Sequence, residues 1–161
     1  MSISTPARSN ELGQVYQNFI GGEWKDAHSG ETFISTNPAR TSEVIGHYQK
    51  SNVADLEEAV SIAVKAQPAW EATPAPVRGE VLYRAAQILE RRQEELAQLM
   101  TREMGKILKE TRGDVQTAID VAKFMAGEGR RAEGETIPSA LPNKLCMTLR
   151  HPIGIVGIIT P

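Results

Sequence analysis

Histidine and cysteine are the side chains most often used to bind metals or attack substrates, and only four of the 161 residues are of these types. His28, His47 and His151 lie far apart and lack the short spacings of a metal site. The single cysteine, Cys146, excludes an internal disulfide framework and a thiolate zinc cluster. It lies outside any recognisable nucleophile motif, so we expect an unreactive cysteine on a strand. From these residue types alone, no complete active site is predicted.

Phosphate-binding loops are also missing, because neither GxGxxG nor GxxxxGK[ST] occurs in the sequence. The nearest pattern is Gly154 and Gly157 within an apolar run, where glycine typically allows close packing. Gly105 and Lys106 follow a helical stretch and are typical of a glycine cap with a cation at the negative end of a helix.

The composition excludes several classes of partner. Lysine and arginine number 18 against 20 acidic residues, a net charge of −2, so no basic surface for nucleic acid is expected. No apolar stretch approaches the roughly 18 residues that a membrane helix needs. The first ten residues lack a basic start followed by an apolar run, which argues against a secretory signal and predicts a cytoplasmic protein.

The N-terminal part predicts strands after a flexible lead-in over residues 1–14. Residues 15–20 and 23–25 are strand-like, and Gly21-Gly22 between them is typical of a hairpin turn. Residues 32–36 and 42–48 predict two more strands, the first of which Asn37-Pro38 ends.

Three main helices are expected next. The first begins at Val53 after Asn52, a good N-cap, and is closed by Pro68 and Trp70. The second extends from about residue 76 to Gly105, and the third covers about residues 109–126.

The last part returns to strands. Apolar and other residues alternate over 144–150, which predicts a half-buried strand, whereas residues 153–159 are apolar on both faces, as in a parallel strand between helix layers. Parallel neighbours need crossover connections of about a dozen residues or more, and the sequence stops at Pro161. We therefore expect the opening third of a larger fold.

Several motifs, in order and spacing, resemble the NAD(P)-dependent aldehyde dehydrogenases. They are Asn-Phe-Ile-Gly-Gly-Glu-Trp at 18–24, Asn-Pro-Ala at 37–39, Leu-Tyr-Arg-Ala-Ala at 82–86, Glu-Met-Gly-Lys at 103–106 and Pro-Ile-Gly-Ile-Val-Gly-Ile-Ile-Thr-Pro at 152–161. The resemblance implies an α/β fold in which strands and three main helices lead to the first strand of a Rossmann-like cofactor domain. Residues 15–161 would be an incomplete N-terminal cofactor-binding domain. A strand at about 144–151 would form homo-oligomers by joining a neighbouring subunit's sheet.

The resemblance also implies a function, the oxidation of an aldehyde to a carboxylic acid with NAD or NADP. Ile159, Thr160 and Pro161 match the first half of the family's cofactor-contacting segment, and Ser35 and Glu103 fall near positions where some members bind a monovalent cation. The family's nucleophilic cysteine and glutamate base have no counterparts in these 161 residues, so we expect the chain alone to be inactive. The alternative is a stand-alone oligomerisation or binding module derived from that fold.

Overall fold

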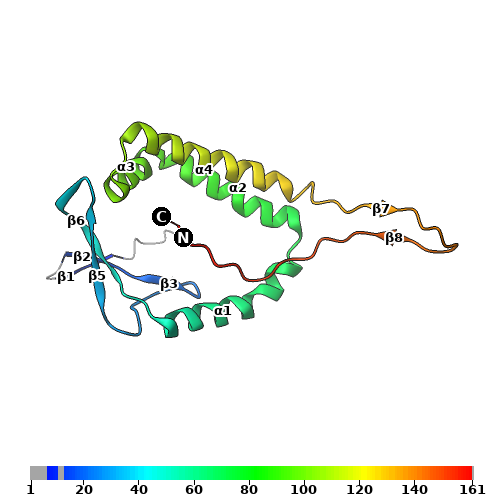
Figure 1. The fold of residues 1–161 in the computed structure, drawn as a ribbon, viewed down its shortest axis with the longest axis horizontal. Coiled ribbons are helices and arrows are strands. Elements are labelled where there is room, and N and C mark those ends of the chain that lie inside the picture. Colours follow the sequence, from blue (N-terminus) through cyan, green and yellow to red (C-terminus); the bar gives the residue numbers. More distant parts are fainter. Residues whose placement is uncertain (1–6, 11–12, 161) are drawn as a thin grey trace.

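The computed structural model describes residues 7–10 and 13–160. Strands come first, then helices, then a long hairpin arm and an extended tail (Figure 1). In chain order the elements are β1 (Ala7–Asn10), β2 (Gly13–Tyr16), β3 (Asn18–Ile20), β4 (Glu23–Lys25), β5 (Thr32–Asn37), β6 (Arg40–Gln49), α1 (Val53–Ala72), α2 (Ala75–Arg91), α3 (Gln93–Met104), α4 (Leu108–Glu128), β7 (Thr136–Ile137) and β8 (Cys146–Met147). The predicted mixed α/β class is confirmed, with four helices in place of the three expected.

The N-terminal strands form two small sheets. The larger has the order β1-β2-β6-β5, in which only the β2–β6 pair is parallel. β3 and β4 form the predicted hairpin, whose turn residues Gly21 and Gly22 have φ of 66° and 86°. Positive φ is strained for most other residues, which explains the two glycines.

Within the predicted lead-in over 1–14, the residues that the structure describes belong to strands β1 and β2. β1 pairs antiparallel with β2, with Arg8 opposite Val15, and β2 also pairs with β6. Main-chain hydrogen bonding to a sheet edge orders this polar segment, which carries no apolar alternation that would reveal it. The remainder of the predicted lead-in, residues 1–6 and 11–12, lies outside the described residues.

Helix α1 begins where the sequence predicts and ends later. The Asn52 side chain accepts a hydrogen bond from the Ala54 N–H, and the Asp55 side chain accepts one from the Asn52 N–H, which together form a capping box. Pro68 does not stop the helix, which continues to Ala72. Proline removes one N–H donor from a helix. In α1 the residues on both sides of Pro68 are nevertheless helical.

The predicted second helix is two helices. Arg92 has φ −107° and ψ 14°, outside the helical region, and separates α2 from α3. The apolar pattern continues across this break, which is why the sequence predicts a single helix. α3 ends at Gly105 with φ 71°, the glycine cap that was predicted.

One cluster of buried apolar residues lies between α3 and α4, and α2 packs along α4. Other buried apolar residues lie in the N-terminal strands, among them Val15 and Ile45. Ala97, Val115 and Ile119 are buried, and the hydroxyl groups of Thr101 and Thr111 lie 2.8 Å apart beside them. Several apolar residues of α1 remain exposed, including Leu56 and Val64.

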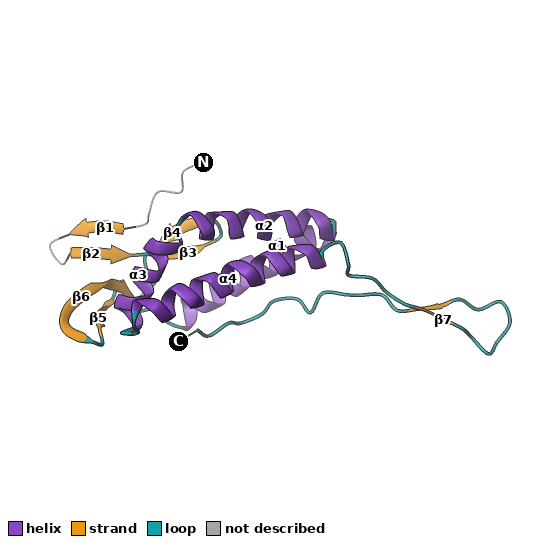
Figure 2. Cartoon of the chain, turned by 90° about the horizontal axis from the view of Figure 1, so that it is seen from above, coloured by secondary structure: helices purple, strands orange, loops and turns teal. Residues whose placement is uncertain are grey.

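Residues 130–150 form an arm that projects beyond the helices (Figures 1 and 2). β7 and β8 pair antiparallel within it, and all of their residues are exposed. The half-buried strand predicted over 144–150 is thus a short, solvent-exposed one, because only one neighbouring strand is present to cover it.

Residues 151–160, which we call the tail, return from the arm toward the helices (Figure 1). The predicted parallel strand over 153–159 is not formed, and the whole tail is exposed. A strand is defined by its hydrogen-bonded neighbours, and none of the described strands pairs with this segment.

Candidate functional site

Two of the predicted site residues, from distant parts of the chain, meet at one cavity. Thr160 in the tail and Glu103 near the end of α3 both line a hollow of about 410 Å³. Its remaining lining is almost entirely apolar and comes from α2, α3 and α4: Leu89, Leu96, Leu99, Met100, Met104, Val115 and Ala118. The cavity can accommodate an apolar group, with one carboxylate and one hydroxyl at its edge.

The other predicted cofactor contacts lie elsewhere. The Ile159 side chain is completely exposed, and Pro161 lies outside the described residues. A Cβ added at Gly154 or Gly157 would meet nothing within 4 Å, so neither glycine marks a close approach. By themselves the described residues do not form a dinucleotide cradle.

The two predicted cation ligands lie on elements that touch. Ser35 is in β5, opposite Gly46 of β6, and α3, which carries Glu103, packs against β5. No group of three or more His, Cys, Asp or Glu side chains that could hold a metal ion occurs among residues 7–10 and 13–160. A cation here would need main-chain carbonyl and hydroxyl oxygens beside Glu103, so this site stays a prediction.

Glu103 acts electrostatically on a neighbouring aromatic cluster. The Tyr16 and Tyr48 rings stack with centroids 4.9 Å apart. Burial raises the pKa of the Tyr48 hydroxyl, and the Glu103 carboxylate and Tyr16 raise it further, while the Arg102 charge acts in the opposite direction. The raised pKa keeps the Tyr48 hydroxyl protonated near neutral pH.

A buried polar cluster that the sequence did not predict surrounds Asp55. Asp55 is only 4% exposed and accepts hydrogen bonds from the main chain of Asn52 and from both the main chain and the ring of His28. These donors, the Asn52 N–H first, lower the pKa of the Asp55 carboxyl to about 2. The position of Asp55, three residues after the N-cap Asn52, is the sequence signal that could have revealed this cluster.

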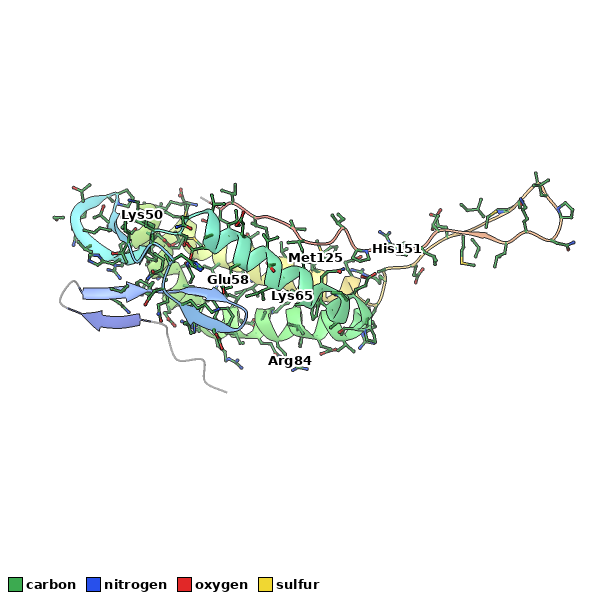
Figure 3. The ribbon with its side chains drawn as sticks, turned by 90° about the horizontal axis from the view of Figure 1, so that it is seen from below. Lys50, Glu58, Lys65, Arg84, Met125 and His151 are labelled. Atoms are coloured by element: carbon green, nitrogen blue, oxygen red, sulfur yellow. The ribbon has the colours of Figure 1, made fainter. Side chains whose placement is uncertain are left out.

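This cluster is structural. In a catalytic triad the ring nitrogen opposite the carboxylate faces a nucleophile. Here His28 Nε2 lies 3.7 Å from a carboxylate oxygen of Glu58, which in turn accepts a 2.8 Å hydrogen bond from Lys25 (Glu58 is labelled in Figure 3). The network ties the turn after β4 to the start of α1.

Cys146 is also distant from any candidate site. It is exposed on β8, opposite Ile137, in the arm. That Cys146 is no nucleophile stays a prediction.

Comparison with known proteins decides the family. The sequence profile described as the aldehyde dehydrogenase family matches residues 24–161. The chain belongs to the aldehyde dehydrogenase family. Relatives in this family use NAD or NADP, as in a 3,6-anhydro-L-galactose dehydrogenase solved in complex with NAP and a NAD-dependent aldehyde dehydrogenase from Sinorhizobium meliloti. The resemblance seen in the motifs, and the parent-family cofactor it implies, are therefore confirmed.

Individual relatives agree. The chain is 42% identical over 147 residues to an alpha-ketoglutaric semialdehyde dehydrogenase of Bacillus subtilis, a match that covers 91% of the chain and 30% of the relative. It is 43% identical over 149 residues to a malonate-semialdehyde dehydrogenase of Halalkalibacterium halodurans, with 92% and 30% covered. A succinate-semialdehyde dehydrogenase from Burkholderia pseudomallei superimposes with a TM-score of 0.83 at 31% identity, over 96% of the chain and 30% of that structure.

The chain thus spans about 30% of the length of the curated relatives it matches. None of the described helices combines the length and the apolar character needed to cross a membrane. Membership of the aldehyde dehydrogenase family establishes the fold of this chain and the class of enzymes to which its relatives belong.

Proposed function

We propose that this chain provides the N-terminal, cofactor-side portion of an enzyme that oxidises an aldehyde to a carboxylic acid with NAD or NADP. The observation that carries the proposal is the extent of the match, over nine-tenths of the chain and at about 40% identity to several dehydrogenases. A cytoplasmic location belongs to the same proposal.

The substrate class follows from the same relatives. Three of these relatives are named as dehydrogenases of alpha-ketoglutaric, malonate and glutarate semialdehyde, each an aldehyde that also carries an acid group. We extend this class, a short aldehyde bearing a carboxylate, to the parent enzyme of the chain.

The 161 residues alone should catalyse nothing. Aldehyde oxidation in this family needs a thiolate that attacks the carbonyl carbon and a base that activates water, and one missing oxyanion donor already costs about 100- to 1,000-fold in rate. The single cysteine is exposed in the arm, and the described residues form no cofactor cradle. Ile159, Thr160 and Pro161 would contact the cofactor only as part of a larger site.

The test is an assay of the purified 161-residue chain with alpha-ketoglutaric, malonate or glutarate semialdehyde and either NAD or NADP. We expect no increase in absorbance from reduced cofactor above buffer, with the Bacillus subtilis relative as the positive control. Turnover that disappears in a Cys146→Ser variant would show that the chain carries its own nucleophile and would overturn the proposal.

A second candidate function, a stand-alone oligomerisation module, is favoured by the arm. Residues 136–149 expose Ile137, Leu145, Met147 and Leu149, and β8 has an open edge that a neighbouring sheet could extend. We propose that residues 144–151 pair with a second subunit.

Hydrogen exchange should then show amides of this segment becoming protected as concentration rises, and a Leu145→Lys/Leu149→Lys variant should lose that protection. Equal exchange at all concentrations would contradict this assignment.

A further inference from the structure

The turn after β4, residues 26–31, is joined to two neighbouring elements by contacts of different kinds. Its connection to the end of β6 uses neutral groups, since the Ala27 N–H donates a 2.8 Å hydrogen bond to the Gln49 side chain. Its connection to the start of α1 uses His28, whose main-chain N–H and ring Nδ1 both lie 2.9 Å from the same oxygen of Asp55. The contact with α1 therefore involves groups whose charge depends on pH.

The ring of His28 lies between two carboxyl groups, one on each ring nitrogen. The pKa of Asp55 is about 2, so near neutral pH its carboxylate only accepts, and Nδ1 must be the donor to it. Nε2 lies 3.7 Å from an oxygen of Glu58, whose pKa the hydrogen bond from Lys25 lowers. A neutral ring therefore turns a lone pair toward Glu58, whereas a protonated ring directs an N–H at each carboxylate.

The two carboxylates favour the protonated ring. After its main-chain donors, the ring of His28 is a further cause of the lowered pKa of Asp55. After the hydrogen bond from Lys25, the charge of His28 also lowers the pKa of Glu58. Coupling between two groups acts equally in both directions, so each carboxylate stabilises the proton on His28.

The other charges beside the turn act in the same direction. The charged residues of the turn and of its neighbouring elements are Glu23 and Lys25 of β4, Asp26 and Glu31 of the turn, Lys50 after β6, and Asp55, Glu57 and Glu58 of α1. Lys25 opposes protonation of His28, but its ammonium group is paired with Glu58 at 2.8 Å. Lys50 is likewise paired with Glu31 at 2.8 Å. The remaining acids leave a net negative charge beside the turn, which favours a positive ring.

We propose that protonation of His28 closes the turn after β4 onto the start of α1, and that loss of this proton loosens the turn as pH rises through the histidine range, about pH 6.5. The folded chain then holds the proton more tightly than the unfolded chain does, so the contact adds stability below this range and loses it above. At the acid end, the contact is lost again as Asp55 takes up a proton near pH 2. The turn is therefore held most firmly in mildly acidic solution.

The experiment compares the 161-residue chain with a His28→Gln variant at about pH 5.5 and about pH 8, on either side of the histidine range. Glutamine keeps the main-chain N–H and a polar side chain but does not titrate. Hydrogen exchange, corrected for the rate of an unstructured peptide, should show the residue 28 amide about two- to fivefold better protected at the lower pH, and the variant should lose this difference. The effect is small because the His28 side chain is 51% exposed, and water screens such ion pairs.

Urea denaturation provides a second measurement. The ratio of folded to unfolded chain, divided by the same ratio for His28→Gln, should be about two- to fivefold higher at the lower pH. Glu58→Gln removes the carboxylate at Nε2 and leaves the one at Nδ1, so it should reduce the pH-dependent difference without abolishing it. His151→Gln is the matched control, because it removes an exposed histidine of the tail, and it should leave the difference unchanged.

The proposal is overturned if the residue 28 amide is equally protected at both pH values, or if His28→Gln keeps the full pH-dependent difference. It is also overturned if His151→Gln removes the difference or Glu58→Gln leaves it unaltered. Every group involved lies within residues 23–58, and no aldehyde or cofactor is present in these measurements, so failure here leaves the proposed function untouched.

Discussion

At the scale of single residues, Asp55 does more for the described structure than any candidate catalytic side chain. Its carboxylate joins the first turn of α1 to the turn at His28 through three hydrogen bonds. The sequence indicates only half of this arrangement. A capping residue is recognisable from its neighbours, whereas the His28 contact joins residues 27 positions apart and depends on how β4 packs beside α1.

Asp55 should also make the free energy of unfolding depend on pH in the acid range. Its pKa is about 2 in the folded chain against 3.8 ordinarily, so the folded state favours the carboxylate. The resulting stabilisation is complete above pH 3.8 and is lost as pH falls through 2. We expect Asp55→Asn to lower the free energy of unfolding at pH 7 and to flatten its decline between about pH 5 and pH 2, measured by urea denaturation.

The control is Glu94, whose pKa Arg112 and Gln98 also lower to about 2. Glu94 is half exposed, and exposed ion pairs contribute little, so Glu94→Gln should leave stability and its pH profile nearly unchanged. If the two variants behave alike, burial of Asp55 is not the cause of its effect.

At the scale of elements, close contact between helices depends on glycines. A Cβ added at Gly79 in α2 would lie 2.4 Å from the main-chain oxygen of Ala126 in α4. The two helices can therefore approach this closely only because position 79 has no side chain. Gly113, in α4, has nothing within 4 Å of the same added atom.

These two glycines provide a matched pair of variants. Gly79→Ala should force α2 and α4 apart and lower the free energy of unfolding by about 1–3 kcal/mol. Gly113→Ala should raise it by about 0.4–1 kcal/mol, because alanine restricts the unfolded chain without a clash. Thermal denaturation monitored by circular dichroism measures both, and a destabilised Gly113→Ala would contradict this account of the helical layer.

Sequence predicts the elements whose signals are local. The Gly21-Gly22 turn, the Asn52 cap and the Gly105 cap are all fixed by residues within a few positions of one another, and all are found. The break at Arg92 and the β1–β2 pairing depend on distant contacts, so the sequence does not show them. The tail was predicted wrongly for a related reason, since its composition suits a strand but a strand needs partners.

At the scale of the whole molecule, the described fold is open. A compact protein of 17.6 kDa exposes about 7,900 Å². This chain exposes 12291 Å², and its exposed apolar residues are spread over the strands, all four described helices, the arm and the tail. The predicted cofactor-contacting residues reflect this openness. Thr160 lines the cavity between α2, α3 and α4, whereas the Ile159 side chain is fully exposed to solvent.

This openness leads to a quantitative expectation. The surface newly exposed on unfolding should be about three-quarters of that for a compact chain of the same mass, by the usual scaling of folded and unfolded areas. Since the urea m-value scales with this surface, it should be about three-quarters of the value typical for this length. Urea titration at low protein concentration measures it, with a compact domain of similar length as the reference.

A size-typical m-value would mean that the exposed faces of α1 and the tail are covered in solution, either by rearrangement within the chain or by a second copy. Repeating the titration at several concentrations separates these two, because only association makes the midpoint depend on concentration.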